Sequence, residues 1–252
     1  MTHQFRTRLV NGELLVGTVV ALSCPEVAEV LAGAGFDWLF IDAEHSPLEA
    51  RDIQALLQGA GPHTPCVVRL SSGDQVPIKK ALDIGAAGII APQVNSAEQA
   101  QAVVRFSKYP PQGARGVGIG RAHGYGLSFQ EYVDTANESI AVIVQAEHAD
   151  AVENIEAIVS VPGIDGVLVG PYDLSASLGR LGQVDHPDVT GAIEHVTRAC
   201  REAGVRLGIF GASPDAVKPY IEQGYTLIAV GGDVTMLGQA ARSVLAELQQ
   251  ET

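Results

Sequence analysis

The chain has 252 residues, of which 46% are hydrophobic and 18% are charged, a balance typical of a globular protein with a large core, which excludes disorder and a coiled coil. The 16 Lys and Arg residues against 29 Asp and Glu residues give a net charge of −13, which disfavours nucleic acid and acidic membrane surfaces as partners. An anionic substrate would therefore need a local cation, either an Arg or a bound metal.

Eight runs rich in Val, Ile and Leu alternate with segments of helical periodicity along the whole chain. The expected strands are Leu14–Leu22, Trp38–Glu44, Cys66–Leu70, Gly88–Val94, Ile140–Glu147, Gly166–Gly170, Arg206–Gly211 and Leu227–Gly232. The expected helices are Pro25–Ala34, Leu48–Gly59, Val76–Ile84, Ala97–Ser107, Ala149–Val159, Val189–Ala203, Asp215–Gln223 and Val234–Leu248.

Several of these strands are apolar on successive residues, such as Val167-Leu168-Val169, which indicates strands buried on both faces of a parallel sheet. Eight such units favour an α/β fold of the (β/α)8 TIM barrel type over an open doubly wound sheet, which more often has five to seven strands. No linker or low-complexity segment divides the chain, so we expect one barrel domain over residues 1–252.

The cysteines Cys24, Cys66 and Cys200 are far apart and match no metal-finger or CxxC spacing, so they are interpreted as reduced thiols. The first residues contain no apolar leader, and no stretch approaches the roughly 18 apolar residues of a membrane span. We therefore expect a cytoplasmic protein that does not bind membranes.

In such a barrel the chemistry lies at the C-terminal ends of the strands, and in this sequence several of those ends are polar. They carry Asp42-Ala43-Glu44-His45 after the second strand, Arg69 at the third, Gln93 at the fourth, Gln145-Ala146-Glu147 at the fifth and Gly170-Pro171-Tyr172-Asp173 at the sixth. These groups converge on one mouth, which predicts a binding site there.

Glu147 and Asp173 end adjacent strands, where two carboxylates can share one divalent cation and leave other positions for water and substrate oxygens. The alternative is that Asp173 caps the following helix. His45 at the same rim is suited to proton transfer near neutral pH. Arg69 is suited to holding a carboxylate or a developing oxyanion, and its alternative role is a buried salt bridge with Asp42 or Glu44.

The longest irregular stretch runs from Tyr109 to Leu127 and is rich in glycine, with Arg115 and Arg121 adding positive charge. We expect an active-site lid here. The alternative is a surface segment that packs against a neighbouring subunit, and the two roles are compatible.

The residues of these segments, taken together, resemble the HpcH/HpaI family of metal-dependent pyruvate aldolases over nearly the whole chain. The resemblance is carried by Phe36-Asp37-Trp38, Ile41-Asp42-Ala43-Glu44-His45, Val68-Arg69, Leu82-Asp83-Ile84-Gly85-Ala86, Tyr109-Pro110-Pro111, Arg115-Gly116-Val117-Gly118, Gln145-Ala146-Glu147, Val161-Pro162-Gly163 and Gly170-Pro171-Tyr172-Asp173-Leu174-Ser175.

The resemblance implies a class II aldolase that reversibly cleaves 4-hydroxy-2-oxo acids to pyruvate or hydroxypyruvate and an aldehyde, through a metal-stabilised enolate. It implies that Glu147 and Asp173 hold Mg²⁺ or Mn²⁺, with Co²⁺ possible. The catalytic set would be His45, Arg69, Asp83 and Asp42, and the substrate would contact Gln145, Tyr172, Asp173, Arg69 and Phe210. Tyr172 and Phe210 replace residues that are commonly smaller, which reshapes the aldehyde pocket.

Asp83 is the family's partner of the histidine, yet it precedes the fourth predicted strand and should lie toward the opposite face of its own barrel. The two placements agree if Asp83 reaches a neighbouring subunit's site, as in a homo-oligomer, a trimer or hexamer with an exchanged C-terminal helix. Two other functions stay open: a citrate-lyase-beta-like lyase acting on acyl thioesters, and a ligand-binding barrel without turnover.

Overall fold

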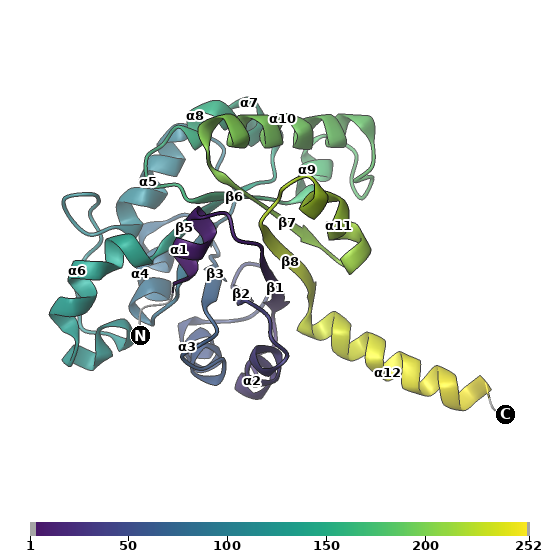
Figure 1. The fold of residues 1–252 in the computed structure, drawn as a ribbon, viewed down its shortest axis with the longest axis horizontal. Helices are drawn as coiled ribbons and strands as arrows, with labels where there is room; N and C mark the ends of the chain where they lie inside the picture. Colours follow the sequence, from purple (N-terminus) through teal and green to yellow (C-terminus); the bar gives the residue numbers. More distant parts are fainter. Residues whose placement is uncertain (1–3, 251–252) are drawn as a thin grey trace.

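The computed structural model describes residues 4–250 and shows a closed barrel of eight parallel strands surrounded by helices (Figure 1). The strands are β1 (Leu15–Val20), β2 (Trp38–Asp42), β3 (Cys66–Arg69), β4 (Gly88–Ala91), β5 (Ala141–Ala146), β6 (Gly166–Val169), β7 (Arg206–Gly211) and β8 (Leu227–Gly232). Each strand pairs in parallel with the next, and β8 pairs with β1. The predicted (β/α)8 TIM barrel is therefore confirmed.

Helices follow the strands and cover the outside of the barrel. They are α1 (Phe5–Val10), α2 (Pro25–Gly33), α3 (Ala50–Gly59), α4 (Gln75–Asp83), α5 (Ala97–Ser107), the 3-10 helix η1 (Arg121–Gly126), α6 (Phe129–Ser139), α7 (Ala149–Glu153), α8 (Ile155–Val159), α9 (Pro171–Ser177), α10 (Pro187–Ala203), α11 (Pro214–Glu222) and α12 (Asp233–Gln250).

The observed elements differ from the expected ones mainly at their ends and in the short helices. The expected fourth strand extends to Val94, whereas β4 ends at Ala91, because Pro92 has no N–H for the ladder and Gln93 has a φ of 52°. The expected helix Ala149–Val159 is divided into α7 and α8 at Asn154, which has a non-helical backbone. The helices α1, α6 and α9 and the 3-10 helix η1 are absent from the sequence prediction.

The barrel interior is filled by large apolar side chains that alternate along the strands with outward-facing ones. Trp38 and Phe40 stack at 5.8 Å between ring centroids, and Phe5 of α1 packs 5.8 Å from Trp38 and closes the N-terminal end of the barrel. Gly17 on β1 makes room for this filling, since a Cβ there would lie 2.6 Å from the Trp38 indole. The N-terminal half of the barrel interior is therefore filled by side chains.

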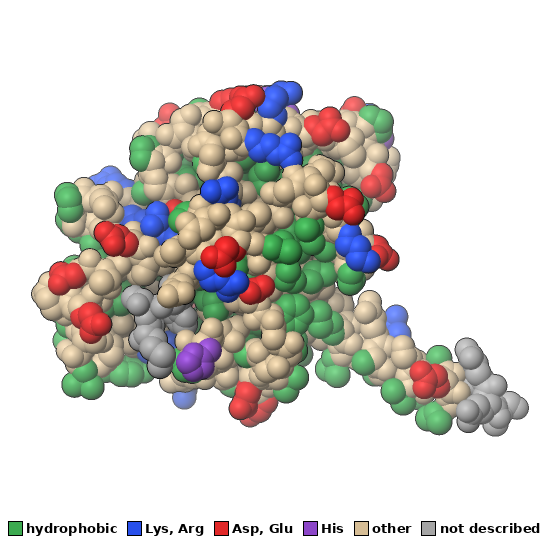
Figure 2. Space-filling view, in the orientation of Figure 1, with side chains coloured by type: hydrophobic (Ala, Val, Ile, Leu, Met, Phe, Trp, Pro, Cys, Tyr) green, Lys and Arg blue, Asp and Glu red, His purple; other side chains and the backbone are tan. Residues whose placement is uncertain are grey.

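The helix α12 leaves the barrel after β8 and extends away from it (Figure 1). Its start is fixed because the buried Asp233 carboxylate accepts hydrogen bonds from the backbone N–H groups of Ala21 (3.0 Å) and Leu22 (2.9 Å). Farther along, Leu237, Val244 and Leu245 are 64%, 58% and 57% exposed, and Figure 2 shows apolar side chains along the projecting helix. Within residues 4–250, α12 included, none of the helices has both the length and the apolar character needed to span a membrane.

Candidate active site

The C-terminal end of the barrel is called the mouth below. Its polar side chains point inward because successive side chains along a strand alternate between the interior and the outside of the barrel. On β2, Trp38 and Phe40 face the interior, so the next residue of that parity, Asp42, also points inward. The same count places Arg69 inward after Val67 on β3, and Gln145 after Ile143 on β5. The inward-facing residues at the C-terminal ends of these strands thus form a polar layer next to the apolar core of the barrel.

Arg69 and Asp42 form a two-pronged ion pair in this layer. Arg69 Nε donates to Asp42 Oδ1 at 2.9 Å and Arg69 Nη2 donates to Oδ2 at 2.8 Å, while the guanidinium lies 5.2 Å from the centroid of the Phe40 ring. Burial acts to raise the pKa of Asp42, but the hydrogen bonds and charge of Arg69 outweigh it and the pKa is lowered. The salt bridge considered for Arg69 is therefore present, and it leaves Arg69 Nη1 for another partner.

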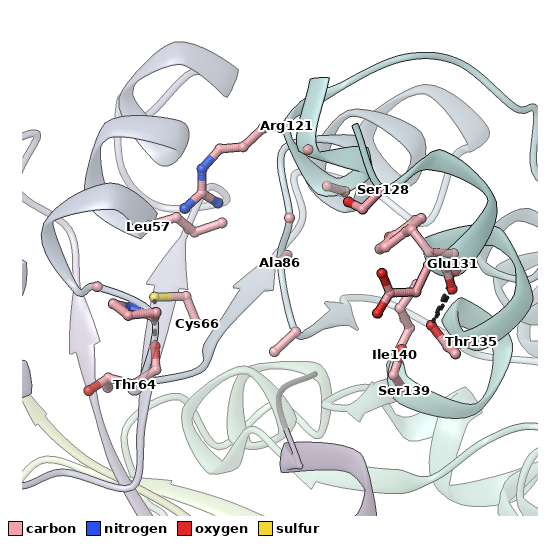
Figure 3. A pocket seen from close by; sticks show the side chains of 17 residues that line it. Leu57, Thr64, Cys66, Ala86, Arg121, Ser128, Glu131, Thr135, Ser139 and Ile140 are labelled. Carbon is pink, nitrogen blue, oxygen red and sulfur yellow. Dashed lines mark hydrogen bonds between the residues drawn. The ribbon is translucent and has the colours of Figure 1, made fainter. Parts of the chain in front are cut away.

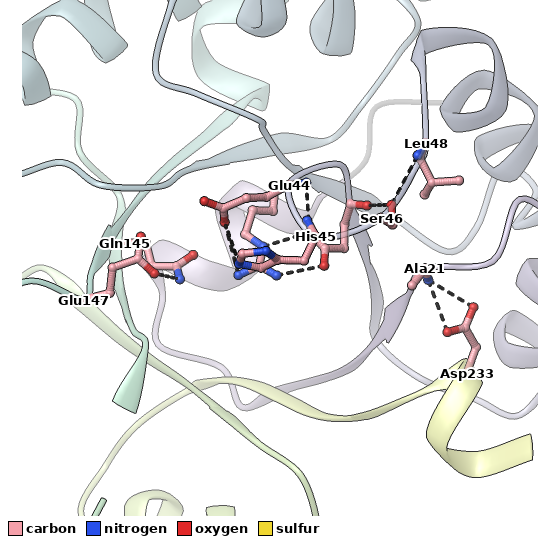
Figure 4. A network of polar contacts seen from close by, with 10 residues as sticks. Ala21, Glu44, His45, Ser46, Leu48, Gln145, Glu147 and Asp233 are labelled. Carbon is pink, nitrogen blue, oxygen red and sulfur yellow. Dashed lines mark hydrogen bonds and ion pairs between the residues drawn. The ribbon is translucent and has the colours of Figure 1, made fainter. Parts of the chain in front are cut away.

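Glu44 and His45 follow Asp42 in a turn at the rim. Asp42 Oδ1 accepts their backbone N–H groups at 3.1 and 3.3 Å, so the carboxylate that holds Arg69 also shapes this turn. Glu44 Oε2 lies 3.4 Å from Arg69 Nη1 and 3.8 Å from His45 Nε2, and Figure 4 shows Glu44 extending toward Gln145 and Glu147. The His45 side chain is 62% exposed, as a group that exchanges protons with a bound molecule must be accessible.

Glu147 is the most unusual group of the mouth, since its carboxylate is buried without a cationic partner. The residue is 2% exposed, and no Lys, Arg or His among residues 4–250 forms an ion pair with it. Burial raises the pKa of Glu147 to about 7, and the nearby carboxylates of Glu44 and Asp173 act in the same direction. A bound cation would remove this penalty.

Asp173 lies in the first turn of α9, exposed at the rim. It is not the cap of that helix, because the N-cap is Gly170 and Pro171 occupies the first helical position. The capping role considered for Asp173 is therefore absent. Its negative charge acts to raise the pKa values of both Glu44 and Glu147, so the three carboxylates repel one another at this rim.

The chain after β6 passes close to Glu147 because residue 170 is glycine. A Cβ at Gly170 would lie 3.0 Å from Glu147 Cβ and 3.1 Å from both Glu147 Oε2 and Gln145 Nε2. Gln145 Nε2 contacts Glu147 Oε2, and the buried Gln145 Oε1 has no hydrogen-bond partner among the described residues. The atoms that could bind a metal ion here are all oxygens, which Mg²⁺ and Mn²⁺ prefer as ligands. Residues 4–250 contain no group of three or more His, Cys, Asp and Glu arranged for a metal, so two carboxylates would hold the cation and leave other positions open.

Asp83 is the one predicted catalytic residue that the fold separates from the others. It ends α4, before β4, and so lies at the N-terminal end of the barrel, as its position before the fourth predicted strand implied. Its carboxylate accepts a 2.7 Å hydrogen bond from Arg115 Nη2, whose guanidinium lies 4.6 Å from the Tyr109 ring centroid and 5.6 Å from that of Tyr132.

The loop from Tyr109 to Leu127 lies at that same N-terminal end, because it connects α5 to α6, which leads into the start of β5. A lid over its own barrel's mouth is therefore wrong, and the contact with a neighbouring subunit stays a prediction. A cavity of about 430 Å³ also lies at this end, between Cys66 and Arg121 on one side and Glu131 and Thr135 on the other (Figure 3). It is distinct from the mouth.

The remaining substrate residues of the prediction lie at the mouth. Phe210 is the second-last residue of β7 and is 37% exposed, and Tyr172 on α9 is 62% exposed. Sequence reasoning missed two contributors. Gly170 was noted only as part of a strand end, and Gln93 was assigned no role, although it donates two hydrogen bonds to Glu147 Oε1. The pair Gly-Pro at a helix start was the available signal for α9, whereas nothing in the sequence signals the backbone of Gln93.

The model of the HpcH/HpaI aldolase/citrate lyase family matches residues 16–240 of this chain. The chain belongs to this family. It is similar to the hydroxypyruvate/pyruvate aldolase of Cupriavidus necator, with 40% identity over 251 residues that cover 99% of this chain and 93% of the relative. It is also similar to the 4-hydroxy-2-oxovalerate aldolase of Rhodococcus jostii, with 42% identity over 98% of this chain and 96% of the relative.

Among solved structures, an HpcH/HpaI aldolase/citrate lyase family protein from Burkholderia cenocepacia superposes with a TM-score of 0.94. The two share 40% identity, and the alignment covers 98% of this chain and all of the other. Family membership and the barrel thus agree with the resemblance derived from the sequence.

Proposed function

We propose that the protein is a class II aldolase that reversibly cleaves 4-hydroxy-2-oxo acids to pyruvate or hydroxypyruvate and an aldehyde. The observation that carries this proposal is Glu147, a buried carboxylate without an ion-pair partner among the described residues, with Asp173 at the same rim. The names of the relatives at about 40% identity, which are aldolases of 2-oxo acids, support the substrate class.

Glu147 and Asp173 would hold the divalent cation, Mg²⁺ or Mn²⁺ with Co²⁺ as a further candidate, because oxygen-only donors suit these ions. When bound, such a cation makes the C–H next to the oxo group more acidic and stabilises the negative charge that develops on oxygen. Gln145, whose Oε1 has no hydrogen-bond partner among the described residues, and the backbone at Tyr172 and Asp173 orient the oxo acid at this position.

Arg69 binds the developing oxygen charge through Nη1, the nitrogen that Asp42 does not hold and whose ion-pair partner is Glu44 Oε2 at 3.4 Å. Asp42 is thus a positioning residue, since it orients Arg69 and the turn of His45 without facing solvent. His45 moves the proton between the substrate and solvent, for which its exposure is required. Phe210 and Tyr172 contact the aldehyde end and narrow its pocket.

We also propose that the chain acts as a homo-oligomer, a trimer or hexamer in the cytoplasm, in which Asp83 reaches the His45 of a neighbouring copy. Arg115 behind Asp83 holds the carboxylate at the surface, where it is 26% exposed. The projecting α12 with its exposed Leu237 and Val244 supports an exchanged C-terminal helix. The free thiols of Cys24, Cys66 and Cys200 suit a reducing compartment.

The test is metal-dependent turnover of a panel of 4-hydroxy-2-oxo acids, with pyruvate release followed by a coupled lactate dehydrogenase assay. We expect no release after chelation and restored release with Mg²⁺ or Mn²⁺. Release from acyl thioesters alone would favour the thioester lyase instead. Metal binding with no turnover of either class would leave a ligand-binding barrel and contradict the proposal.

A further inference from the structure

Gln93 has a backbone conformation that long side chains rarely adopt. Its φ is 52°, and among residues 4–250 it shares a positive φ only with Tyr125 and a set of glycines. A non-glycine residue in this left-handed region is strained, and such strain persists where the surrounding structure holds it in place, often at functional sites. Gln93 directly follows β4 and Pro92, so the strain lies at the mouth.

The left-handed turn brings two donors of Gln93 onto one oxygen of Glu147. The backbone N–H donates to Glu147 Oε1 at 2.9 Å, and the side-chain Nε2 donates to the same oxygen at 3.0 Å. The backbone donor would be present with any residue except proline at this position. The amide is the contribution of glutamine, and it fixes the carboxylate from a second direction.

The second oxygen of Glu147 is left for the open side of the mouth. Glu147 Oε2 contacts only Gln145 Nε2 among the hydrogen-bond donors described, and it faces the position that a Cβ at Gly170 would fill. The two oxygens of the carboxylate therefore have different surroundings: Oε1 accepts two hydrogen bonds from Gln93, and Oε2 contacts the Gln145 amide beside Gly170.

We propose that Gln93 is a positioning residue that orients the Glu147 carboxylate for a divalent cation and so sets the metal affinity of the mouth. The inference rests on the proposed function, because it takes Glu147 as a metal ligand. Partners that orient a ligand without touching the metal commonly change its affinity by about 10–100-fold when removed. The amide of Gln93 is such a partner, and nothing in its position requires it for packing, since the residue is exposed.

The test measures Mn²⁺ binding to metal-free protein at one fixed pH, with free Mn²⁺ followed by electron paramagnetic resonance. Gln93→Met keeps the length of the side chain and removes the donor, and Gln93→Asn keeps an amide that is too short to reach Glu147. Asparagine tolerates the left-handed backbone well, so it decides the question if the methionine variant does not fold. Gln101→Met, on the exposed face of α5, is the matched control, and Glu147→Gln tests the ligand itself.

We expect both Gln93 variants to bind Mn²⁺ about 10–100-fold more weakly than wild type, with the control unchanged. Thermal unfolding of the metal-free variants is measured alongside, because a merely structural role would weaken Mn²⁺ binding only where the fold is lost, whereas the inference predicts weaker binding in variants that remain folded. Wild-type Mn²⁺ affinity in both Gln93 variants, with binding lost in Glu147→Gln, would overturn the inference and leave the proposed function intact. Wild-type affinity in Glu147→Gln as well would overturn both.

Discussion

Two arginine–carboxylate pairs occupy opposite ends of the barrel, and they present opposite charges. At the mouth, Arg69 pairs with Asp42 at 2.8 Å, and the side chains are 14% and 6% exposed. At the N-terminal end, Arg115 pairs with Asp83 at 2.7 Å, but here the arginine is 0% exposed and the carboxylate 26%. Each guanidinium lies over an aromatic ring, at 5.2 Å from Phe40 and 4.6 Å from Tyr109.

The same type of ion pair therefore exposes a different partner at each end of the barrel. At the mouth the carboxylate is held behind the arginine, so the cationic group faces the space where an anionic substrate would bind. At the other end the arginine is held behind the carboxylate, so a negative group reaches the surface. In a chain of net charge −13, the Arg69 guanidinium would supply the local cation that an anionic substrate needs.

The largest expected effect is at the mouth, in the division of labour between His45 and Glu147. His45→Ala should slow proton exchange at the methyl group of pyruvate by about 100-fold or more, because the positioned acid–base group is lost. It should leave Mn²⁺ affinity unchanged, whereas Glu147→Ala should abolish both. Exchange is measured by NMR and Mn²⁺ binding by titration.

His63→Ala is the matched control for that comparison, since His63 is an exposed histidine between α3 and β3 at the far end of the barrel. It should behave as wild type in both measurements. An equal loss of Mn²⁺ binding in the His45 and Glu147 variants would contradict the assigned roles.

A second pair of variants separates the two arginines. Arg69→Lys should lower kcat/KM by about 100-fold, because a single ammonium cannot hold Asp42 with two hydrogen bonds and also bind a developing oxyanion. Arg115→Lys should instead lower the free energy of unfolding by about 1–3 kcal/mol, because hydrogen bonds and ring contacts of a buried side chain are lost. Kinetics and urea unfolding of both variants check this, and full kcat/KM in Arg69→Lys would refute the role of the mouth pair.

The smallest expected effect is a pH dependence of the free energy of unfolding, which comes from Glu147, the buried carboxylate without an ion pair. The pKa of Glu147 is raised to about 7 in the folded protein, above the 4.5 of a free glutamate side chain, so the folded state binds this proton more tightly. The protonated form therefore adds stability that is fully present below pH 4.5, the pKa of the unfolded chain, and that is lost as the pH rises through about 7, the pKa in the folded state. In metal-free protein, wild type should therefore lose about 1–3 kcal/mol relative to Glu147→Gln between pH 5 and pH 8.

Urea unfolding at a series of pH values measures this difference, with Glu147→Gln as the reference at every pH. Glutamine suits this purpose because its oxygen can still accept from Gln93, and the Gln145 amide can turn its unpartnered oxygen toward the new NH₂ group. A constant difference from pH 5 to pH 8 would show that the buried carboxylate is not destabilising when ionised.

The barrel and the polar mouth could be predicted because both follow from repetition. Runs rich in Val, Ile and Leu recur eight times between helical segments, and a parallel barrel brings the residue after each strand to one end. The inward placement of Asp42 and Arg69 follows from the period of two along a strand. The position of Asp83 at the opposite end followed from chain order alone.

The features that escaped prediction depend on contacts or backbone angles rather than on pattern. The left-handed backbone of Gln93 has no sequence signal, since glutamine does not favour it. The need for glycine at position 170 comes from Glu147 and Gln145 on the neighbouring strand. The loop from Tyr109 to Leu127 was expected as a lid from its glycines, but chain order between α5 and β5 already placed it at the wrong end.

The most direct test of the account is deuterium exchange into the methyl group of pyruvate, followed by NMR with chelated protein and again after Mg²⁺ or Mn²⁺ is restored. It needs no knowledge of the aldehyde. The account predicts exchange that requires the cation and depends on His45 and Glu147. Exchange that is equally fast in the chelated protein would contradict a mouth in which Glu147 and Asp173 act through a bound metal.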